Sequence, residues 1–77
     1  MKKLKTKVQT MYDLGVQQAE LTLKGDLERA KQVLEQGMNM LAKEIGNALY
    51  IKMIINFTAG YRVRIGENNH PILSHKL

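Results

Sequence analysis

The chain has 77 residues, no cysteine and a formal net charge of +5. A chain of this length forms one domain at most and can hardly enclose an enzyme's pocket, so we expect no enzymatic activity. The missing cysteines exclude disulfides and thiolate metal sites and suit a reducing compartment.

Apolar residues recur every three or four positions over residues 3–23, which is the period of one helical face. They are Leu4, Val8, Met11, Tyr12, Val16, Ala19 and Leu23. Lys24, Gly25 and Asp26 follow as a cation at a helix end, a glycine that can adopt positive φ, and an N-cap for a second helix. The sequence therefore predicts a helix over 3–23 that ends in a tight turn.

A second helix is predicted over residues 26–45, where the same period continues. Its apolar or small positions are Leu27, Ala30, Leu34, Gly37, Leu41 and Ile45. The short connection makes it antiparallel to the first helix. Small residues at Gly15, Ala19, Ala30 and Gly37 would let the two backbones approach closely. Gly46 predicts a break after this helix, although the apolar pattern can also continue through it.

Residues 48–64 are predicted to form a third helix, apolar on more than one face and so in need of several neighbours. The alternative is a C-terminal β-hairpin built from residues 54–58 and 61–65, where β-branched and aromatic residues are dense. Residues 66–71 favour a turn. We thus expect an all-α domain over residues 1–65, a helical hairpin plus a third helix, with a flexible tail over 66–77. An α+β fold is the alternative.

The turn and the second helix resemble the core pattern of a tetratricopeptide repeat. The pattern has a large residue four before the turn glycine, followed by small, large and small positions on the next helix. The matching residues are Leu21, Gly25, Asp26, Ala30, Leu34 and Gly37. Residues 43–47 look like the long repeats of bacterial peptide-sensing regulators, and Asn56, Phe57 and Tyr61 resemble the start of a second repeat. Gln17 and Gln18 do not fit the pattern of the first repeat. In the second repeat, the spacing from Tyr61 to the turn glycine, Gly66, is one residue too long.

The resemblance implies one and a half repeats, whose open end a partner or a second copy would have to cover. It also implies an inner surface on the first helix of each pair. That surface would contain Tyr12, Gly15, Ala19, Met53, Asn56 and Gly60. In the resembled regulators an asparagine near Asn56 grips the backbone of a bound peptide. The alternative for Asn56 is a residue that faces solvent or caps a local kink.

Protein–protein recognition is the function we expect, with the third helix buried against a second copy or a larger protein. A small regulator or inhibitor, such as those carried by mobile genetic elements, would have this form. The expected contact residues are Ile51, Ile54, Ile55, Asn56, Phe57, Tyr61, Arg62 and Arg64.

The alternative function is nucleic-acid binding, which would use the basic N-terminal residues together with Arg62 and Arg64. The N-terminal cations are Lys2, Lys3, Lys5 and Lys7. No known DNA- or RNA-binding motif accompanies them.

No cofactor or metal site is expected, because His70 and His75 lack the i,i+4 spacing of helical zinc ligands. The residues after Lys5 are too polar for a signal peptide, and the apolar segment 48–57 is too short to span a membrane. We therefore expect a cytoplasmic protein.

Overall fold

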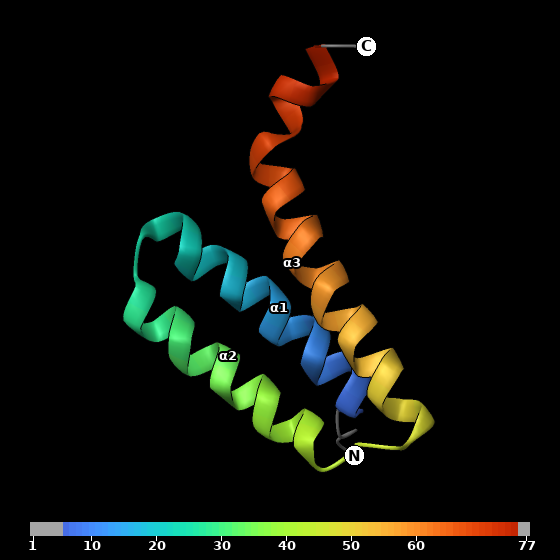
Figure 1. Ribbon diagram of the computed structural model, residues 1–77. Coiled ribbons are helices and arrows are strands. Elements are labelled where there is room, and N and C mark those ends of the chain that lie inside the picture. The colour runs from blue at the N-terminus through green and yellow to red at the C-terminus, as the bar shows by residue number, and fades with distance from the viewer. Residues whose placement is uncertain (1–5, 76–77) are drawn as a thin grey trace, which may run out of the picture.

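The computed structural model describes the backbone of residues 6–75 and the side chains of residues 6–66. Within that range the chain forms α1 (Lys7–Lys24), α2 (Leu27–Ala42) and α3 (Ala48–His75). α1 and α2 make an antiparallel hairpin, and α3 crosses α1 and projects beyond the hairpin (Figure 1). The all-α prediction is confirmed. The β-hairpin alternative is wrong, because residues 54–74 lie within α3.

Local capping explains where α1 ends and α2 begins. Gly25 has a φ of 81°, and the N–H of Asp26 donates to the Leu21 carbonyl at 2.9 Å. The Asp26 side chain then accepts a hydrogen bond from the Arg29 N–H at 3.3 Å. These contacts satisfy backbone groups that helix ends leave without partners. The predicted turn at residues 24–26 is confirmed.

A second glycine separates α2 from α3. α2 ends at Ala42, before the predicted end at residue 45, and Gly46 has a φ of 84° within the following turn. A left-handed conformation is easy for glycine and costly for other residues, so the helix cannot continue through this position. The predicted break at Gly46 is confirmed.

α3 is longer than the sequence suggested. It continues to His75, past the predicted end at residue 64, so the turn expected at residues 66–71 does not form in the backbone. The flexible tail predicted over residues 66–77 stays a prediction, and residues 76–77 lie outside the described backbone. Glycine and asparagine lower helix propensity but do not end a helix by themselves. Among the described residues positive φ occurs only at Gly25 and Gly46, so Gly66 does not redirect the chain as they do.

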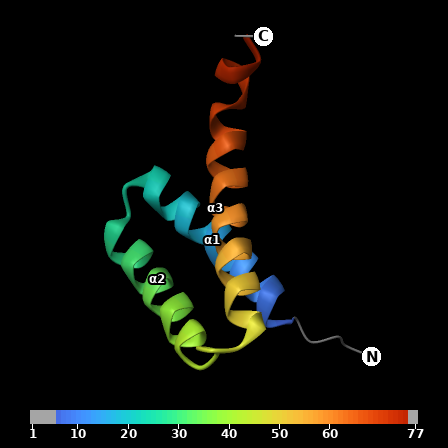
Figure 2. The same ribbon diagram turned by 45° about the vertical axis from the view of Figure 1, so that its right-hand side comes forward.

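The core lies where α1 meets both other helices. Its buried large side chains are Met11, Leu14, Val33 and Met53. α3 packs mainly against α1 and touches α2 much less, and the turned view shows it running along the α1 side of the hairpin (Figure 2). α1 is therefore the central helix of the fold.

Two glycines allow α1 and α3 to cross in direct backbone contact. A Cβ atom at Gly15 would overlap the Phe57 carbonyl oxygen of α3, and one at Gly60 would overlap the Tyr12 carbonyl oxygen of α1. Gly15 was expected to face α2, and that part of the prediction is wrong. Spacing alone indicates that a small residue permits close packing, but not which helix approaches it.

Candidate functional site

An apolar groove lies between α2 and α3, with α1 beneath it. It encloses about 80 Å³. Its lining residues are Met11, Leu34, Gly37, Met38, Leu41, Ile54, Phe57 and Thr58. The Phe57 ring fits beside Gly37, 3.5 Å from the position that a Cβ atom would take there. The groove is smaller than the usual 300–1,000 Å³ of a small-molecule site, so apolar side chains suit it better than a metabolite.

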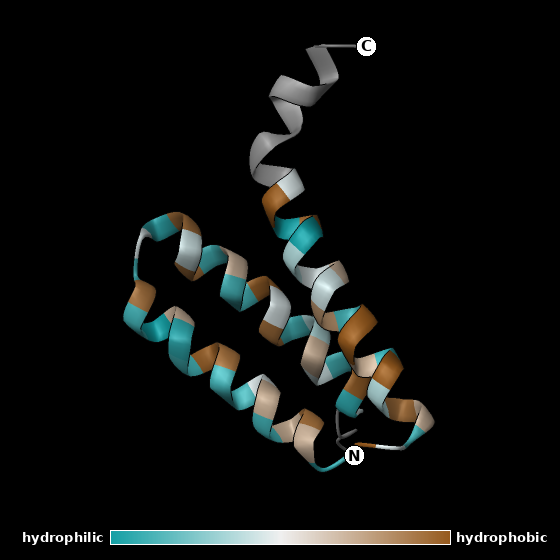
Figure 3. Cartoon of the chain, in the orientation of Figure 1, coloured by the Kyte–Doolittle hydropathy of each residue, from teal (hydrophilic) through white to brown (hydrophobic). Residues whose placement is uncertain are grey.

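Rows of exposed apolar side chains extend the groove on both helices. On α2, Leu34 is 41% exposed and Met38 is 58% exposed. On α3, Ile51 and Ile55 are 56% and 58% exposed, and Ile54 lies between them at the groove wall. In Figure 3, hydrophobic and hydrophilic residues alternate along α2, and hydrophobic residues are dense in the first half of α3. We call the groove together with Ile51 and Ile55 the α2–α3 face.

Four of the predicted contact residues lie together on this face, namely Ile51, Ile54, Ile55 and Phe57. The sequence interpretation missed the α2 half of the face. Leu34 and Met38 are four residues apart on one side of α2, which is a signal of a shared apolar row. Periodicity could have identified that row, but it could not show that the row stays exposed.

The other predicted contact residues do not line the groove. Asn56 donates from Nδ2 to the Lys52 carbonyl of the same helix at 2.9 Å. Tyr61 is half-buried and Arg62 is exposed. Arg64 forms an ion pair with Glu20 of α1, with Nε and Oε2 3.2 Å apart.

The open inner surface implied by the repeat resemblance does not form as expected. Ala19 and Met53 are fully buried, and Gly15 and Gly60 are enclosed at the crossing of α1 and α3. Direct backbone contact at the two glycines leaves no space there for a bound peptide. These residues therefore serve packing.

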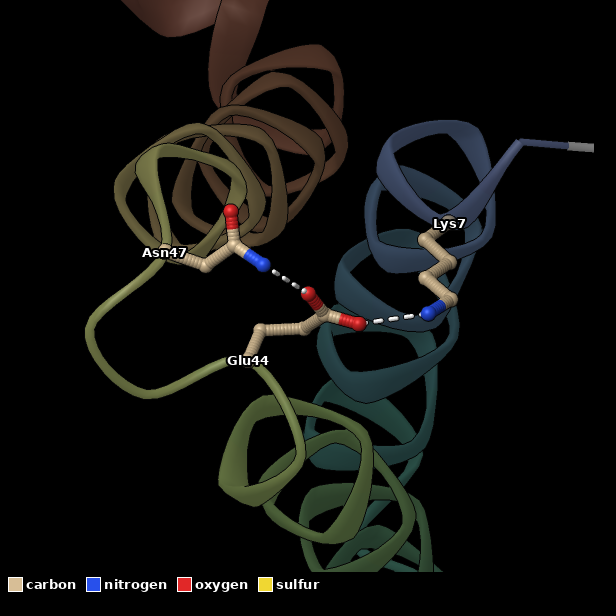
Figure 4. Close-up of polar contacts among 3 residues, drawn as sticks. All are labelled: Lys7, Glu44 and Asn47. Carbon is tan, nitrogen blue, oxygen red and sulfur yellow. Dashed lines mark hydrogen bonds and ion pairs between the residues drawn. The ribbon is translucent and has the colours of Figure 1, made fainter.

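A polar cluster joins the helices at the end of the molecule where α2 finishes. Glu44 is only 6% exposed, and its Oε2 accepts a hydrogen bond from Lys7 Nζ at the start of α1. Its Oε1 accepts from Asn47 Nδ2 at 3.1 Å (Figure 4). Buried charges need such partners, so the cluster stabilises the turn between α2 and α3. Sequence reasoning missed Glu44, although it follows Met40 by four residues and so continues the buried side of α2.

The described cations of the nucleic-acid alternative, Lys7, Arg62 and Arg64, are not brought to one patch. Lys7 binds Glu44 and Arg64 binds Glu20, whereas Lys2, Lys3 and Lys5 lie outside the described residues. Arg62 is roughly 20 Å along α3 from the helix start beside Glu44, at 1.5 Å per residue. Arg62 and Lys7 therefore lie at different ends of the fold.

Comparison with known proteins assigns no family. No protein-family model, curated protein or solved structure matches the chain. The tetratricopeptide-repeat resemblance therefore stays a prediction from the residues that carry it.

Two features of the described residues bear on the expected site types. Over the described residues, no helix has both the length and the apolar character to cross a membrane. In the same part of the chain, no three His, Cys, Asp or Glu side chains gather as metal ligands. His70 and His75 lie outside the residues whose side chains are described.

Proposed function

We propose that this protein is a small interaction module that binds a protein partner, or a second copy of itself, through the α2–α3 face. The observation that carries the proposal is the exposure of a contiguous apolar surface on two helices. Leu34, Met38, Ile51, Ile54 and Ile55 are each at least 37% exposed. Exposed apolar patches of this kind mark interaction sites in soluble proteins.

The small size of the core supports the same proposal. Among the described residues, four large side chains are buried, namely Met11, Leu14, Val33 and Met53. A single core in a chain of this length seldom supplies more than about 3–5 kcal/mol of stability. A partner that binds only the folded chain would add to that stability by mass action.

Binding suits the face better than catalysis. Its lining contains no titratable side chain, and the Thr58 hydroxyl is its one polar side-chain group. General acid–base or nucleophilic chemistry needs an activated group within reach of a substrate. We therefore propose a regulator or inhibitor that acts by binding. A cytoplasmic location fits its cysteine-free sequence.

Site-specific photo-crosslinking tests the proposal. A photoreactive phenylalanine analogue replaces Ile55 on the face, and in a matched control it replaces Leu23 on α1, which is 45% exposed but outside the face. In cells, position 55 should give a discrete adduct and position 23 should not. The mass of the adduct distinguishes a second copy from a different protein.

The proposal would be wrong if position 55 gave no adduct, or the same adducts as position 23. Light scattering of the purified chain over a concentration series and at two salt concentrations provides an independent check of self-association.

Nucleic-acid binding is the weaker proposal, because two of its cations are engaged in ion pairs. It predicts affinity for DNA or RNA that falls steeply with salt. Replacing Lys3 and Lys5 together, with Lys7 kept in its contact with Glu44, should reduce that affinity and leave crosslinking at position 55 unchanged.

A further inference from the structure

We infer that Met38 is an oxidation site, at which a peroxide converts the thioether to a sulfoxide and so removes an apolar side chain from the α2–α3 face. This inference rests on the proposed function and adds a chemical means of regulating it. The exposure of Met38 selects it among the described methionines, and its position in the groove gives the modification its effect.

Methionine is the only source of oxidisable sulfur in this chain, because the sequence has five methionines and no cysteine. With hydrogen peroxide, a lone pair of the thioether sulfur attacks one peroxide oxygen, an S–O bond forms and the O–O bond breaks. The transferred oxygen gives its proton to the leaving hydroxide, so the products are the sulfoxide and water. The sulfur loses two electrons and the peroxide gains them.

The described methionines differ widely in exposure. Met11 and Met53 are 1% and 0% exposed and belong to the core, and Met40 is half-buried against it. Met38 is 58% exposed. A buried side chain reacts only when the fold opens locally or globally, whereas an exposed one reacts in the folded chain. Met38 is therefore the described methionine that a peroxide reaches most readily.

Met38 also lies where a change of polarity has most effect on the face. It follows Leu34 by one turn and precedes Leu41, and all three line the groove, whereas Met40 does not. Two residues correspond to about 200° around a helix, so Met38 and Met40 lie on opposite sides of α2. A sulfoxide is polar, and an apolar partner would cover its oxygen without supplying a hydrogen bond. Oxidation of Met38 should therefore weaken binding at the face.

The modification is reversible, as regulation requires. Methionine sulfoxide reductases remove the oxygen. Two thiols of the reductase supply two electrons and two protons, a disulfide forms, and the oxygen leaves as water. The chain itself has no thiol, so it depends on such an enzyme for its recovery. Oxidation lowers the apolar character of the face whichever protein the face binds.

A time course of oxidation by hydrogen peroxide tests the site with the full chain. Mass spectrometry of peptides measures the sulfoxide fraction at each methionine, in buffer and in urea. In buffer, Met38 should be oxidised at least about tenfold faster than Met11 and Met53, because the fold protects the buried pair. In urea the three rates should converge, since unfolding exposes every side chain.

A fluorescent hydrophobic dye measures the effect on the face, and circular dichroism checks the fold. The oxidised chain should bind less dye at an unchanged helical signal, and treatment with sulfoxide reductases should restore dye binding. Met38→Leu should keep its dye binding after peroxide, whereas the matched control Met40→Leu should lose dye binding as wild type does. Met38→Gln, which has a polar side chain of similar length, should bind less dye without peroxide.

Photo-crosslinking in cells extends the test to the partner. Met38→Gln should weaken the adduct from position 55, and Met38→Leu should retain it. Oxidation of Met38 no faster than that of Met11 in the folded chain would overturn the inference. A loss of helical signal in peroxide, equal in wild type and Met38→Leu, would also overturn it, because unfolding would then explain the loss of dye binding.

Two further results separate the inference from the proposed function. Selective oxidation of Met38 with unchanged dye binding, where Leu34→Gln still lowers dye binding, would remove the regulation and retain the face. No effect of Leu34→Gln or Met38→Gln on dye binding, together with no adduct from position 55, would remove the proposed function as well.

Discussion

Glycine has different physical roles at different positions of this chain. Gly15 and Gly60 have no space for a side chain, because the backbone of the opposite helix occupies it. Gly37 has space, since a Cβ atom there would meet the Phe57 ring at 3.5 Å, an ordinary contact. Alanine at these positions therefore tests whether a glycine is required by packing or only tolerated.

Gly15→Ala and Gly60→Ala should each destabilise the fold by about 3 kcal/mol or more, because the new methyl group must displace helix backbone. Gly37→Ala should instead stabilise the protein by about 0.5–1 kcal/mol, since alanine is the better helix former. Urea unfolding followed by circular dichroism measures all three variants. A stable Gly15→Ala protein would show that α1 and α3 do not cross as closely as described.

Glu44 is the residue whose removal should cost most among the acidic side chains with described partners. Glu44→Ala removes hydrogen bonds from Lys7 and Asn47 to a buried carboxylate, so we expect a loss of about 1.5–3 kcal/mol. Glu44→Gln keeps one side-chain oxygen acceptor and a similar shape, so it should lose less stability than Glu44→Ala. Glu35→Ala, at an exposed position on the same helix, should stay within about 0.5 kcal/mol of wild type. Equal losses for Glu44→Ala and Glu35→Ala would contradict a stabilising role for the cluster.

At the scale of elements, two turns with positive φ divide one long helical pattern into three helices. Gly25 and Gly46 supply these turns, and nothing lies within 4 Å of a Cβ atom at either. Both positions have space for a side chain, so it is the positive φ that requires glycine there. Gly66 is equally unobstructed but has no positive φ, and α3 continues through it.

Gly25→Ala and Gly46→Ala should each lower stability by about 1 kcal/mol, the cost of placing a side chain in the left-handed region. Gly66→Ala should raise stability slightly, because it improves helix propensity without strain. Thermal unfolding of the three variants under one condition makes the comparison. A gain in stability for Gly46→Ala would mean that α2 and α3 can join through that position.

At the scale of the whole molecule, the described residues include more exposed large apolar side chains than buried ones. Leu34 and Leu23 provide a matched pair, the first on the α2–α3 face and the second outside it, with 41% and 45% exposure. Neither leucine side chain is buried, so replacing either one with a polar residue should leave the fold intact.

Leu34→Gln and Leu23→Gln should each change the free energy of unfolding by no more than about 0.5 kcal/mol, as is usual for exposed positions. Only Leu34→Gln should reduce binding of a fluorescent hydrophobic dye, because the dye reports contiguous apolar surface. Titration of the dye into each variant at equal protein concentration measures the effect. Equal reductions would indicate that the dye binds elsewhere.

The sequence by itself predicted three helices in this order and the two turns that separate them, but it left a β-hairpin open for residues 54–65 and did not predict how far α3 extends. These depend on local signals: the apolar period, Asp26 as an N-cap, and the glycines at residues 25 and 46. It also identified Ile51, Ile54, Ile55 and Phe57 as candidates for the contact surface. Such features follow from backbone conformation and from which residues share a helical face.

Tertiary structure alone decided which faces are covered. It placed Gly15 against α3 instead of α2, and it left Leu34 and Met38 exposed beside the isoleucines of α3. It also buried Glu44 between Asn47 in the following turn and Lys7, which is 37 residues away in the sequence. The physical reason is that periodicity defines an apolar side of each helix, whereas the packing of several helices decides which side meets a neighbour and which remains available to a partner.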